Sequence, residues 1–347
     1  MQLQKGDPFG THRVIEPEGV LPQPAWRLDS VSPLYANECL IDVECLNIDS
    51  ASFVQIKEAC EHDDSKVKEM IMKIITDRGK MHNPVTGSGG MLIGRVSQIG
   101  VEFPAPDLQV GDQVATLVSL TLTPLLVEEI QHVNMNNGQI LIKGKAILFA
   151  SCPFAILPED LPESVSLAAL DVCGAPAQVA RLVQPSDTVV VLGAGGKSGL
   201  LSLAVAWQAA GKKGKVIAIE SNPAACEVIR ELGMAHEVQS VNAKEPLAVK
   251  EVIEELTDGK LADITVNCVN VPDTELSSIL ATRDGGTVYF FSTAVKFTAA
   301  ALGAEGAGKD VQMMIGNGYA PGHAELTLQL LRDHQALKDI FYRRYQA

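Results

Sequence analysis

The fold is decided by residues 189–199, which read VVVLGAGGKSG. An apolar run typical of a buried β-strand breaks there into glycines, and an apolar helical pattern, LLSLAVAW, follows at residues 200–207. Glycines allow a sharp turn from strand to helix and let backbone N–H groups approach a phosphate, while the helix N-terminus adds partial positive charge. This segment therefore predicts a turn that binds the pyrophosphate of a dinucleotide.

A second strand supports this prediction. Residues 215–220 read KVIAIE and end in Glu220, about 20 residues beyond Gly199, where dinucleotide-binding folds carry an acid for the ribose hydroxyls. A carboxylate there would repel a 2′-phosphate, so NAD is favoured, although three lysines within residues 212–215 leave NADP open. The plainer alternatives are a buried turn without a ligand and a surface acid at the end of a strand.

The glycines fit the spacing G-x-x-G-x-x-G better than G-x-G-x-x-G, because Ser198 stands at the third glycine position of the second pattern. Asn270 follows an apolar run at residues 262–269, and the carboxyl ends of parallel strands line the nucleotide crevice. The cofactor contacts expected from the sequence are Gly193, Ala194, Gly195, Gly196, Lys197, Ser198, Gly199, Glu220 and Asn270.

Composition limits the classes to which the chain can belong. Its 347 residues are many for one hydrophobic core, so two domains are expected. The formal net charge of −14 argues against a surface for nucleic acid or an anionic membrane. We find neither an apolar run of membrane-spanning length nor a basic and then apolar N-terminus, and we expect a cytoplasmic protein. The seven cysteines are never spaced C-x-x-C, which indicates neither a disulfide framework nor a structural zinc site.

The second half of the chain has the pattern of a parallel sheet covered by helices, because strands and helices alternate from Pro185 onward. Six short apolar runs supply the strands that two mononucleotide-binding halves require. These runs lie at residues 189–192, 215–220, 237–241, 262–269, 287–291 and 310–315. Helices are predicted at residues 224–232, between Asn222 and Gly233, and at residues 244–256.

The first 150 residues look different, because short β-like runs are separated by proline and glycine, as in a compact and mostly antiparallel barrel. These runs lie at residues 38–46, 91–99, 113–118 and 146–149. Residues 64–78 interrupt the pattern, since apolar residues recur there at helical spacing among lysines and glutamates. We expect a packed or interface helix, with a lid as the alternative.

Three segments follow from these patterns. Residues 1–156 are predicted to form the barrel domain and residues 157–317 the dinucleotide-binding domain, with a linking helix within residues 158–180. The remaining residues, 318–347, are too few for a domain. We expect them to return to the N-terminal unit.

Several segments resemble the medium-chain dehydrogenase/reductase superfamily. They are PVTGSGGMLIGRV at residues 84–96, VGDQV at residues 110–114, and Cys173-Gly174 ahead of the glycine turn. The resemblance spans nearly the whole chain. It implies an α/β protein in which a GroES-like, mostly antiparallel β-barrel catalytic domain precedes a six-stranded parallel Rossmann domain. It also implies an oxidoreductase that uses a nicotinamide cofactor.

The zinc ligands of that superfamily are not matched. Zinc-dependent members carry a cysteine near the position of Asp49 and a His-Glu pair where this chain has Ser88 and Gly89. Only Cys173 falls at a ligand position, whereas a catalytic zinc needs three protein ligands and one open position. We therefore expect no metal. The alternative is an improvised site of Asp49, Asp171 and Cys173, but zinc sites that are rich in carboxylates and lack histidine are uncommon.

A narrower resemblance, to the L-erythro-3,5-diaminohexanoate dehydrogenase family, is carried by four segments. They are FGTHRVIEP at residues 9–17, GVLPQPA at residues 19–25, LNIDSASF at residues 46–53 and HNPVTGSGG at residues 82–90. This resemblance implies NAD(P)-dependent oxidative deamination of that diamino acid of lysine fermentation to 5-amino-3-oxohexanoate and ammonia. The alternatives are a zinc-independent quinone or enone reductase and a nucleotide-binding protein that has lost catalysis. A homodimer is the default expectation for the assembly.

The implied chemistry needs a group that takes up a proton. Hydride leaves a carbon only beside a neutral amine, whereas an alkylammonium has a pKa near ~10. Asp49 is the first choice for the base or amine-binding carboxylate, with a helix N-cap as the alternative. Asp171 is its expected partner, unless it is a structural acid. Ser88 is expected to bind substrate or water, unless it only forms a tight turn.

Other residues are weighed for the remaining roles. His82 and His12 are candidates for proton transfer, although an isolated histidine is more often structural. Arg13 is a candidate for the substrate carboxylate, with a surface arginine as the plainer alternative. Cys173 is expected to line the pocket, because hydride transfer needs no covalent intermediate.

Overall fold

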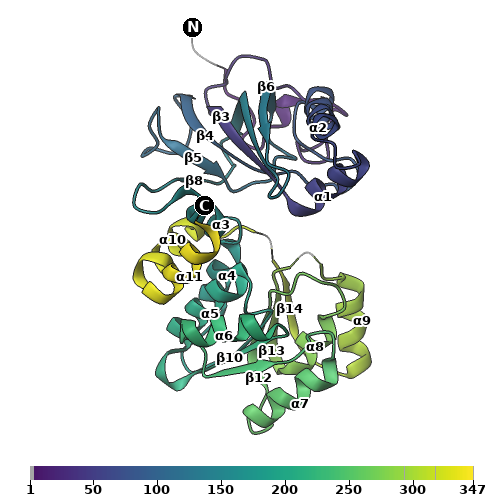
Figure 1. Ribbon diagram of the computed structural model, residues 1–347, viewed down its shortest axis with the longest axis vertical. Helices are drawn as coiled ribbons and strands as arrows, with labels where there is room; N and C mark the ends of the chain where they lie inside the picture. The colour runs from purple at the N-terminus through teal and green to yellow at the C-terminus, as the bar shows by residue number, and fades with distance from the viewer. Residues whose placement is uncertain (1–3, 293, 317, 347) are drawn as a thin grey trace. The chain divides into compact units, whose positions relative to one another are not determined.

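The computed structural model describes residues 4–292, 294–316 and 318–346, which divide into two units, Met1–Pro158 and Glu159–Ala347 (Figure 1). Each unit has its own sheet and its own cluster of buried apolar side chains. The division lies two residues beyond the predicted boundary at residues 156 and 157. None of the helices in the described residues has the length and apolar character of a membrane span.

The N-terminal unit is built on a six-stranded antiparallel sheet with the order β6-β7-β3-β4-β5-β8. The strands are β3 (Glu38–Ile48), β4 (Gly90–Ile99), β5 (Gln113–Thr116), β6 (Leu125–Val133), β7 (Gln139–Phe149) and β8 (Phe154–Ile156). A short ribbon of β1 (Val14–Glu16) and β2 (Arg27–Leu28) and the 3-10 helix η1 (Thr11–Arg13) precede it. The predicted GroES-like class of this unit is confirmed.

Two helices connect β3 to β4. Helix α1 (Ser50–Ala59) begins after Asp49, and α2 (Asp64–Arg78) has the bounds that the helical pattern predicted. The apolar stripe of α2 places Val67, Ile71 and Ile75 in the core of the unit, where the helix packs against β6, β2 and α1. Helix α2 is therefore a packed helix of the N-terminal unit.

The C-terminal unit contains a six-stranded parallel sheet with the order β11-β10-β9-β12-β13-β14. The strands are β9 (Thr188–Leu192), β10 (Lys215–Glu220), β11 (Glu237–Ser240), β12 (Ala262–Asn267), β13 (Thr282–Phe290) and β14 (Gln312–Ile315). All six predicted strands are present, and the Rossmann class is confirmed. The chain moves outward from β9 in one direction and then in the other, so the carboxyl end of β9 is the switch point at which such sheets bind ligands.

Helices cover both faces of this sheet (Figure 1). The helices of the C-terminal unit are α3 (Glu163–Leu170), α4 (Gly174–Leu182), α5 (Lys197–Ala210), η2 (Gly211–Lys213), α6 (Pro223–Leu232), α7 (Pro246–Leu256), α8 (Glu275–Ala281), α9 (Phe297–Ala307), α10 (His323–Asp333) and α11 (Gln335–Tyr345). Helix α4 packs against α5, and α11 contacts both α5 and α6, whereas α7, α8 and α9 form a second group. The linking segment thus holds two helices, α3 and α4, instead of one.

The C-terminal helices depart from the expectation for residues 318–347. Helices α10 and α11 pack against α3, α4, α5 and α6 of the C-terminal unit. Their buried apolar side chains include Leu328, Leu331, Leu337 and Phe341. Because these apolar side chains are buried against other helices of the C-terminal unit, the segment groups with the Rossmann unit and not with the N-terminal unit.

Candidate active site

The glycine turn has the backbone geometry that a nucleotide requires. Gly193 has a φ of 70°, which favours glycine, and a Cβ on Gly199 would lie 2.4 Å from the carbonyl oxygen of Gly193. Gly196 precedes α5, and a Cβ there would approach only that same carbonyl oxygen, at 3.8 Å. There is therefore room for a group beside Gly196, at the N-terminus of α5, where a helix presents N–H groups that its own turns do not pair. These residues fit the pyrophosphate of a dinucleotide.

Glu220 holds this turn from the neighbouring strand. One carboxylate oxygen accepts the Gly195 N–H at 3.0 Å, and the other accepts the N–H groups of Ser221 and Asn222 at 2.9 Å and 3.0 Å. A carboxylate offers about four lone-pair directions, so three backbone bonds leave capacity for one further donor. Glu220 can thus fix the turn and still accept a ribose hydroxyl.

Lys197 and Asp171 form an ion pair beside the turn. The ammonium of Lys197, at the first position of α5, lies 2.5 Å from a carboxylate oxygen of Asp171. Both side chains are partly exposed, which makes the pair weak as a source of stability. Asp171 is therefore placed beside the nucleotide turn through Lys197, within the C-terminal unit.

Asp49 caps α1 with only half of its carboxylate. Its Oδ1 accepts the Ser52 N–H at 3.0 Å, which is the N-cap bond that the alternative interpretation expected. Its Oδ2 is buried and has no hydrogen-bond partner among the described residues. A buried acceptor without a donor is unfavourable, so the site is suited to an incoming N–H or O–H group.

Ser52, whose N–H bonds to this carboxylate, also joins a ring of three hydroxyl groups. The Ser52 hydroxyl is 2.6 Å from that of Thr86 and 2.7 Å from that of Ser88, and the last two are 3.0 Å apart. In such a ring each hydroxyl donates once, which leaves lone pairs that can accept further hydrogen bonds. Thr86 also receives the Ser88 N–H, and Ser52 is fully buried, so Ser88 offers the spare acceptor.

The loop that carries Ser88 is fixed to α1. The Asn83 side chain donates to Gln55 at 2.8 Å and accepts the Val85 N–H at 2.9 Å. The Asn83 N–H in turn bonds to the carbonyl oxygen of Ser88 at 2.9 Å. The tight turn that sequence reasoning proposed for Ser88 is therefore present, together with the hydroxyl contacts.

Comparison with known proteins decides the family. The N-terminal domain of L-erythro-3,5-diaminohexanoate dehydrogenase matches residues 12–158. The chain is 52% identical over 342 residues to the L-erythro-3,5-diaminohexanoate dehydrogenase of Acetoanaerobium sticklandii, covering 98% of this chain and 99% of the relative. It is 51% identical over 340 residues to that of Fusobacterium nucleatum, covering 98% and 99%. The chain belongs to the L-erythro-3,5-diaminohexanoate dehydrogenase family.

Two further matches place this family in the wider superfamily. A zinc-binding dehydrogenase domain matches residues 198–304. Among solved structures, the chain is similar to the CurK enoyl reductase, with a TM-score of 0.56, 18% identity and coverage of 96% of this chain and 87% of that one. These matches support the medium-chain dehydrogenase fold, and together with the two curated relatives the family match supports an oxidoreductase that takes a nicotinamide cofactor and a small-molecule substrate.

The donor set of this diaminohexanoate dehydrogenase family member does not fit a catalytic zinc. Burial raises the pKa of the Cys173 thiol to about 12, and Asp171 is paired with Lys197. Within each unit taken by itself, the described residues contain no three His, Cys, Asp or Glu side chains that converge as metal ligands.

His82 precedes the loop that carries Ser88 and is a weak base. Burial, together with the nearby charges of Arg78 and Lys80, lowers the pKa of His82 to about 4. Its Nδ1 is buried without a partner among the described residues. His82 is therefore neutral near pH 7, where it can accept a hydrogen bond but cannot store a proton.

His12 and Arg13 have structural partners. Arg13 is fully buried, and its guanidinium binds Glu38 at 2.9 Å and 2.6 Å and also the carbonyl oxygens of Ser32 and Pro33. His12 Nε2 lies 2.8 Å from the same Glu38 carboxylate. These contacts make the pair part of the N-terminal unit's interior, so the predictions of a substrate-carboxylate ligand and of a surface arginine are both wrong.

Sequence reasoning missed some residues. Ser52 and Thr86 complete the hydroxyl ring, and the only signals were the Asp-x-x-Ser spacing after Asp49 and the Thr-Gly-Ser turn. Asn270, expected to contact the cofactor, is exposed in the loop after β12. The buried Asn267 ends that strand and donates to Thr274 and Ser278 of the α8 region.

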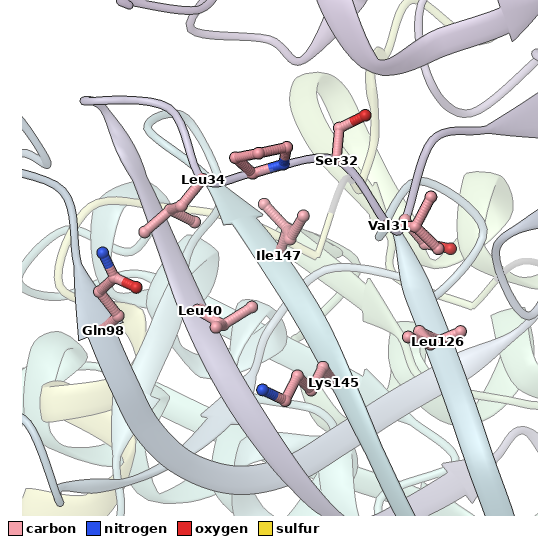
Figure 2. Close-up of a pocket in the computed structure, with 10 residues that line it drawn as sticks. Val31, Ser32, Leu34, Leu40, Gln98, Leu126, Lys145 and Ile147 are labelled. Atoms are coloured by element: carbon pink, nitrogen blue, oxygen red, sulfur yellow. The ribbon is translucent and has the colours of Figure 1, made fainter. Parts of the chain in front are cut away.

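Two cavities in the N-terminal unit lie apart from the predicted catalytic residues. One, of about 380 Å³, is lined by the loop at residues 30–34 and side chains of the sheet, among which Gln98 and Lys145 carry the polar groups (Figure 2). The other, of about 310 Å³, lies between α2 and residues 83–85. Neither of these two cavities is lined by Asp49, His82 or Ser88.

Proposed function

We propose that this chain catalyses the NAD-dependent oxidative deamination of L-erythro-3,5-diaminohexanoate. The hydrogen on carbon 3 leaves with its electron pair, the carbon–nitrogen double bond that remains takes up water, and ammonia departs to give 5-amino-3-oxohexanoate. The bound nicotinamide would supply the hydride acceptor. Support comes from the family assignment and from the acceptor-rich group of Asp49, Ser52 and Ser88.

The observation that carries this proposal is the Oδ2 of Asp49, which is buried and has no hydrogen-bond partner in the described part of the chain. An alkylammonium donates three hydrogen bonds and needs acceptors, whereas a quinone carbonyl needs donors. Both Asp49 and Ser88 form hydrogen bonds with Ser52. Asp49 accepts the Ser52 backbone N–H, and the Ser88 hydroxyl, which has a spare lone pair, bonds with the Ser52 hydroxyl. The site therefore suits an amine better than the quinone or enone of the alternative function.

Proton removal must precede or accompany hydride loss, because only the neutral amine has a lone pair that can form the double bond to carbon. We assign this proton transfer to Asp49, since its cap bond fixes the carboxylate with one oxygen directed away from the helix amide. Ser88 would hold the amine or the attacking water, and Asp171 would act through Lys197 beside the nucleotide turn.

The cofactor preference rests on Glu220. Its carboxylate has room for a ribose hydroxyl but would meet the 2′-phosphate of NADP with like charge. We accordingly propose NAD as the preferred cofactor, and we propose a homodimer in the cytoplasm as the working state.

Purified protein incubated with NAD and L-erythro-3,5-diaminohexanoate tests the proposal directly. We expect reduced cofactor and ammonia in equal amounts, and the same rate after prolonged treatment with a chelator. Simple alcohols with NAD, and quinones with reduced cofactor, serve as controls. Turnover of a quinone without turnover of the diamino acid would assign the chain to the reductase alternative.

A further inference from the structure

Arg344, near the end of the chain, reaches the nucleotide turn. It lies on α11, and its Nη1 donates a hydrogen bond to the carbonyl oxygen of Gly195 at 2.8 Å across 149 positions of sequence. The next residue toward the N-terminus, Arg343, instead forms a two-pronged pair with Glu231 of α6 at 2.9 Å and 2.7 Å. Two adjacent arginines of α11 thus contact different parts of the unit, the glycine turn and α6.

The bond from Arg344 complements the bond from Glu220. The Gly195 N–H is held by Glu220 at 3.0 Å, and the Gly195 carbonyl is held by Arg344, so the two successive peptide planes around this glycine are both fixed. No side chain on residue 195 could contribute, because a Cβ there would lie 2.6 Å from the Cβ of Ala225. The orientation of these peptides must come from outside the turn.

The second of these peptide planes leads into the N-terminus of α5. It joins Gly195 to Gly196, and the N–H of Gly196 makes only a long bond of 3.4 Å to Gly193. A charged donor binds a carbonyl about twice as strongly as a neutral one, so Arg344 supplies the firmest contact to this plane. The guanidinium also adds positive charge at the place where phosphate groups are expected.

We propose that Arg344 is a positioning residue for the nucleotide, which couples the docking of the C-terminal helix α11 to cofactor affinity. The inference rests on the nucleotide-binding part of the proposed function and is independent of the substrate. It identifies a contributor to the cofactor site at the far end of the chain from the glycine motif.

Calorimetric titration of NAD and of ADP into the Arg344→Ala and Arg343→Ala variants tests this role without any amine substrate. Loss of a charged hydrogen bond predicts that Arg344→Ala weakens NAD by about tenfold or more. Arg343→Ala removes an ion pair of the same helix without touching the turn, so its affinity should stay within about twofold of the unaltered protein. Arg344→Lys, which keeps the charge and one donor, should restore part of the loss.

Activity measurements add a second readout. Arg344→Ala should raise KM for NAD while leaving kcat at saturating NAD close to the unaltered value, because the residue acts on the turn and not on the reacting atoms. Unchanged NAD affinity in Arg344→Ala, or equal weakening in both alanine variants, would overturn the proposal. Failure of the diamino acid to turn over would reject the substrate assignment and leave the titration result intact.

Discussion

The glycine turn of the C-terminal unit and the Asp49 region of the N-terminal unit satisfy their polar groups in opposite ways. Around the turn, Glu220 accepts three N–H groups and Lys197 is paired with Asp171. In the N-terminal unit, one carboxylate oxygen of Asp49 and the Nδ1 of His82 are each buried without partners among the described residues. Under the proposed function, the first region would bind a nucleotide through preorganised backbone groups, whereas the second would offer its unused acceptors to the substrate.

This difference has an energetic meaning. An unsatisfied buried acceptor costs about 1–3 kcal/mol, and a ligand that supplies the donor recovers that free energy. The side chains around the glycine turn already have partners, so they gain little from new bonds to a ligand. What the turn offers instead is the backbone N–H groups at the start of α5. Changes in the Asp49 region should therefore act mainly on turnover, and changes in the turn mainly on nucleotide affinity.

The largest expected effect is that of Asp49→Asn. The amide oxygen can keep the cap bond to Ser52, but the side chain no longer accepts a proton, so kcat should fall by about 100-fold or more. Calorimetric titration should show NAD binding close to that of the unaltered protein. Full activity of the variant would show that Asp49 does not transfer the proton. It would also contradict the proposed difference in function between the two regions.

The next effect should be that of Gly199→Ala. Its Cβ would lie 2.4 Å from the carbonyl oxygen of Gly193, so the turn must shift; overpacking of this kind costs about 1–3 kcal/mol. We expect a lower melting temperature and loss of most NAD affinity. The matched control is Gly196→Ala, because its Cβ meets only one atom, at 3.8 Å.

Gly196→Ala should therefore leave the melting temperature nearly unchanged while the added methyl group enters the space assigned to the pyrophosphate. Weaker NAD binding at unaltered stability would locate the nucleotide beside α5. If Gly196→Ala bound NAD normally while Gly199→Ala did not, the turn would be structural, as in the alternative of a buried turn without a ligand.

A smaller effect is expected for Glu220→Gln, which keeps the size of the side chain. Loss of the charge should weaken NAD by about tenfold, because the ribose contact and the bracing of Gly195 both depend on the carboxylate. Affinity for NADP should fall less or rise, since repulsion of the 2′-phosphate is removed. Titration of both cofactors gives the ratio, and an equal loss for the two would deny Glu220 any contact with the ribose.

The smallest effect concerns the dependence of stability on pH. Burial, with Arg78 and Lys80, lowers the pKa of His82 from 6.5 to about 4, so the unfolded chain takes up a proton in that interval that the folded chain does not. The stability contributed by neutral His82 is full above pH 6.5 and is lost as the pH falls to about 4. His82→Asn should therefore show a flatter fall in melting temperature over this interval, and identical slopes would contradict the burial.

Much of the fold could be predicted from residues close together in sequence. The six strands, the bounds of α2, and the cap and end of α6 at Asn222 and Gly233 follow from apolar spacing and from capping chemistry. The C-terminal segment was predicted less well, because the pattern of α10 and α11 shows an apolar stripe but not the surface that buries it.

The candidate site divides along the same line. The glycine turn was recognisable because its backbone demands are local, as the φ of Gly193 and the close approach of Gly199 show. The hydroxyl ring could not be predicted, since Ser52 and Thr86 are 34 positions apart and meet only through the packing of α1 against the loop before β4. Arg13 was misjudged because Glu38, its partner, is 25 positions away.

The sequence by itself determined the class of fold, the nucleotide turn and the carboxylate at the start of α1, because strand and helix periods, glycine conformations and caps depend on neighbours within a few residues. Only the tertiary structure decided which polar groups are satisfied. It left Oδ2 of Asp49 with no partner among the residues that the structure describes, lowered the pKa of His82 by burial, and brought Arg344 to Gly195. Those outcomes depend on contacts and desolvation between distant segments, which no local pattern encodes.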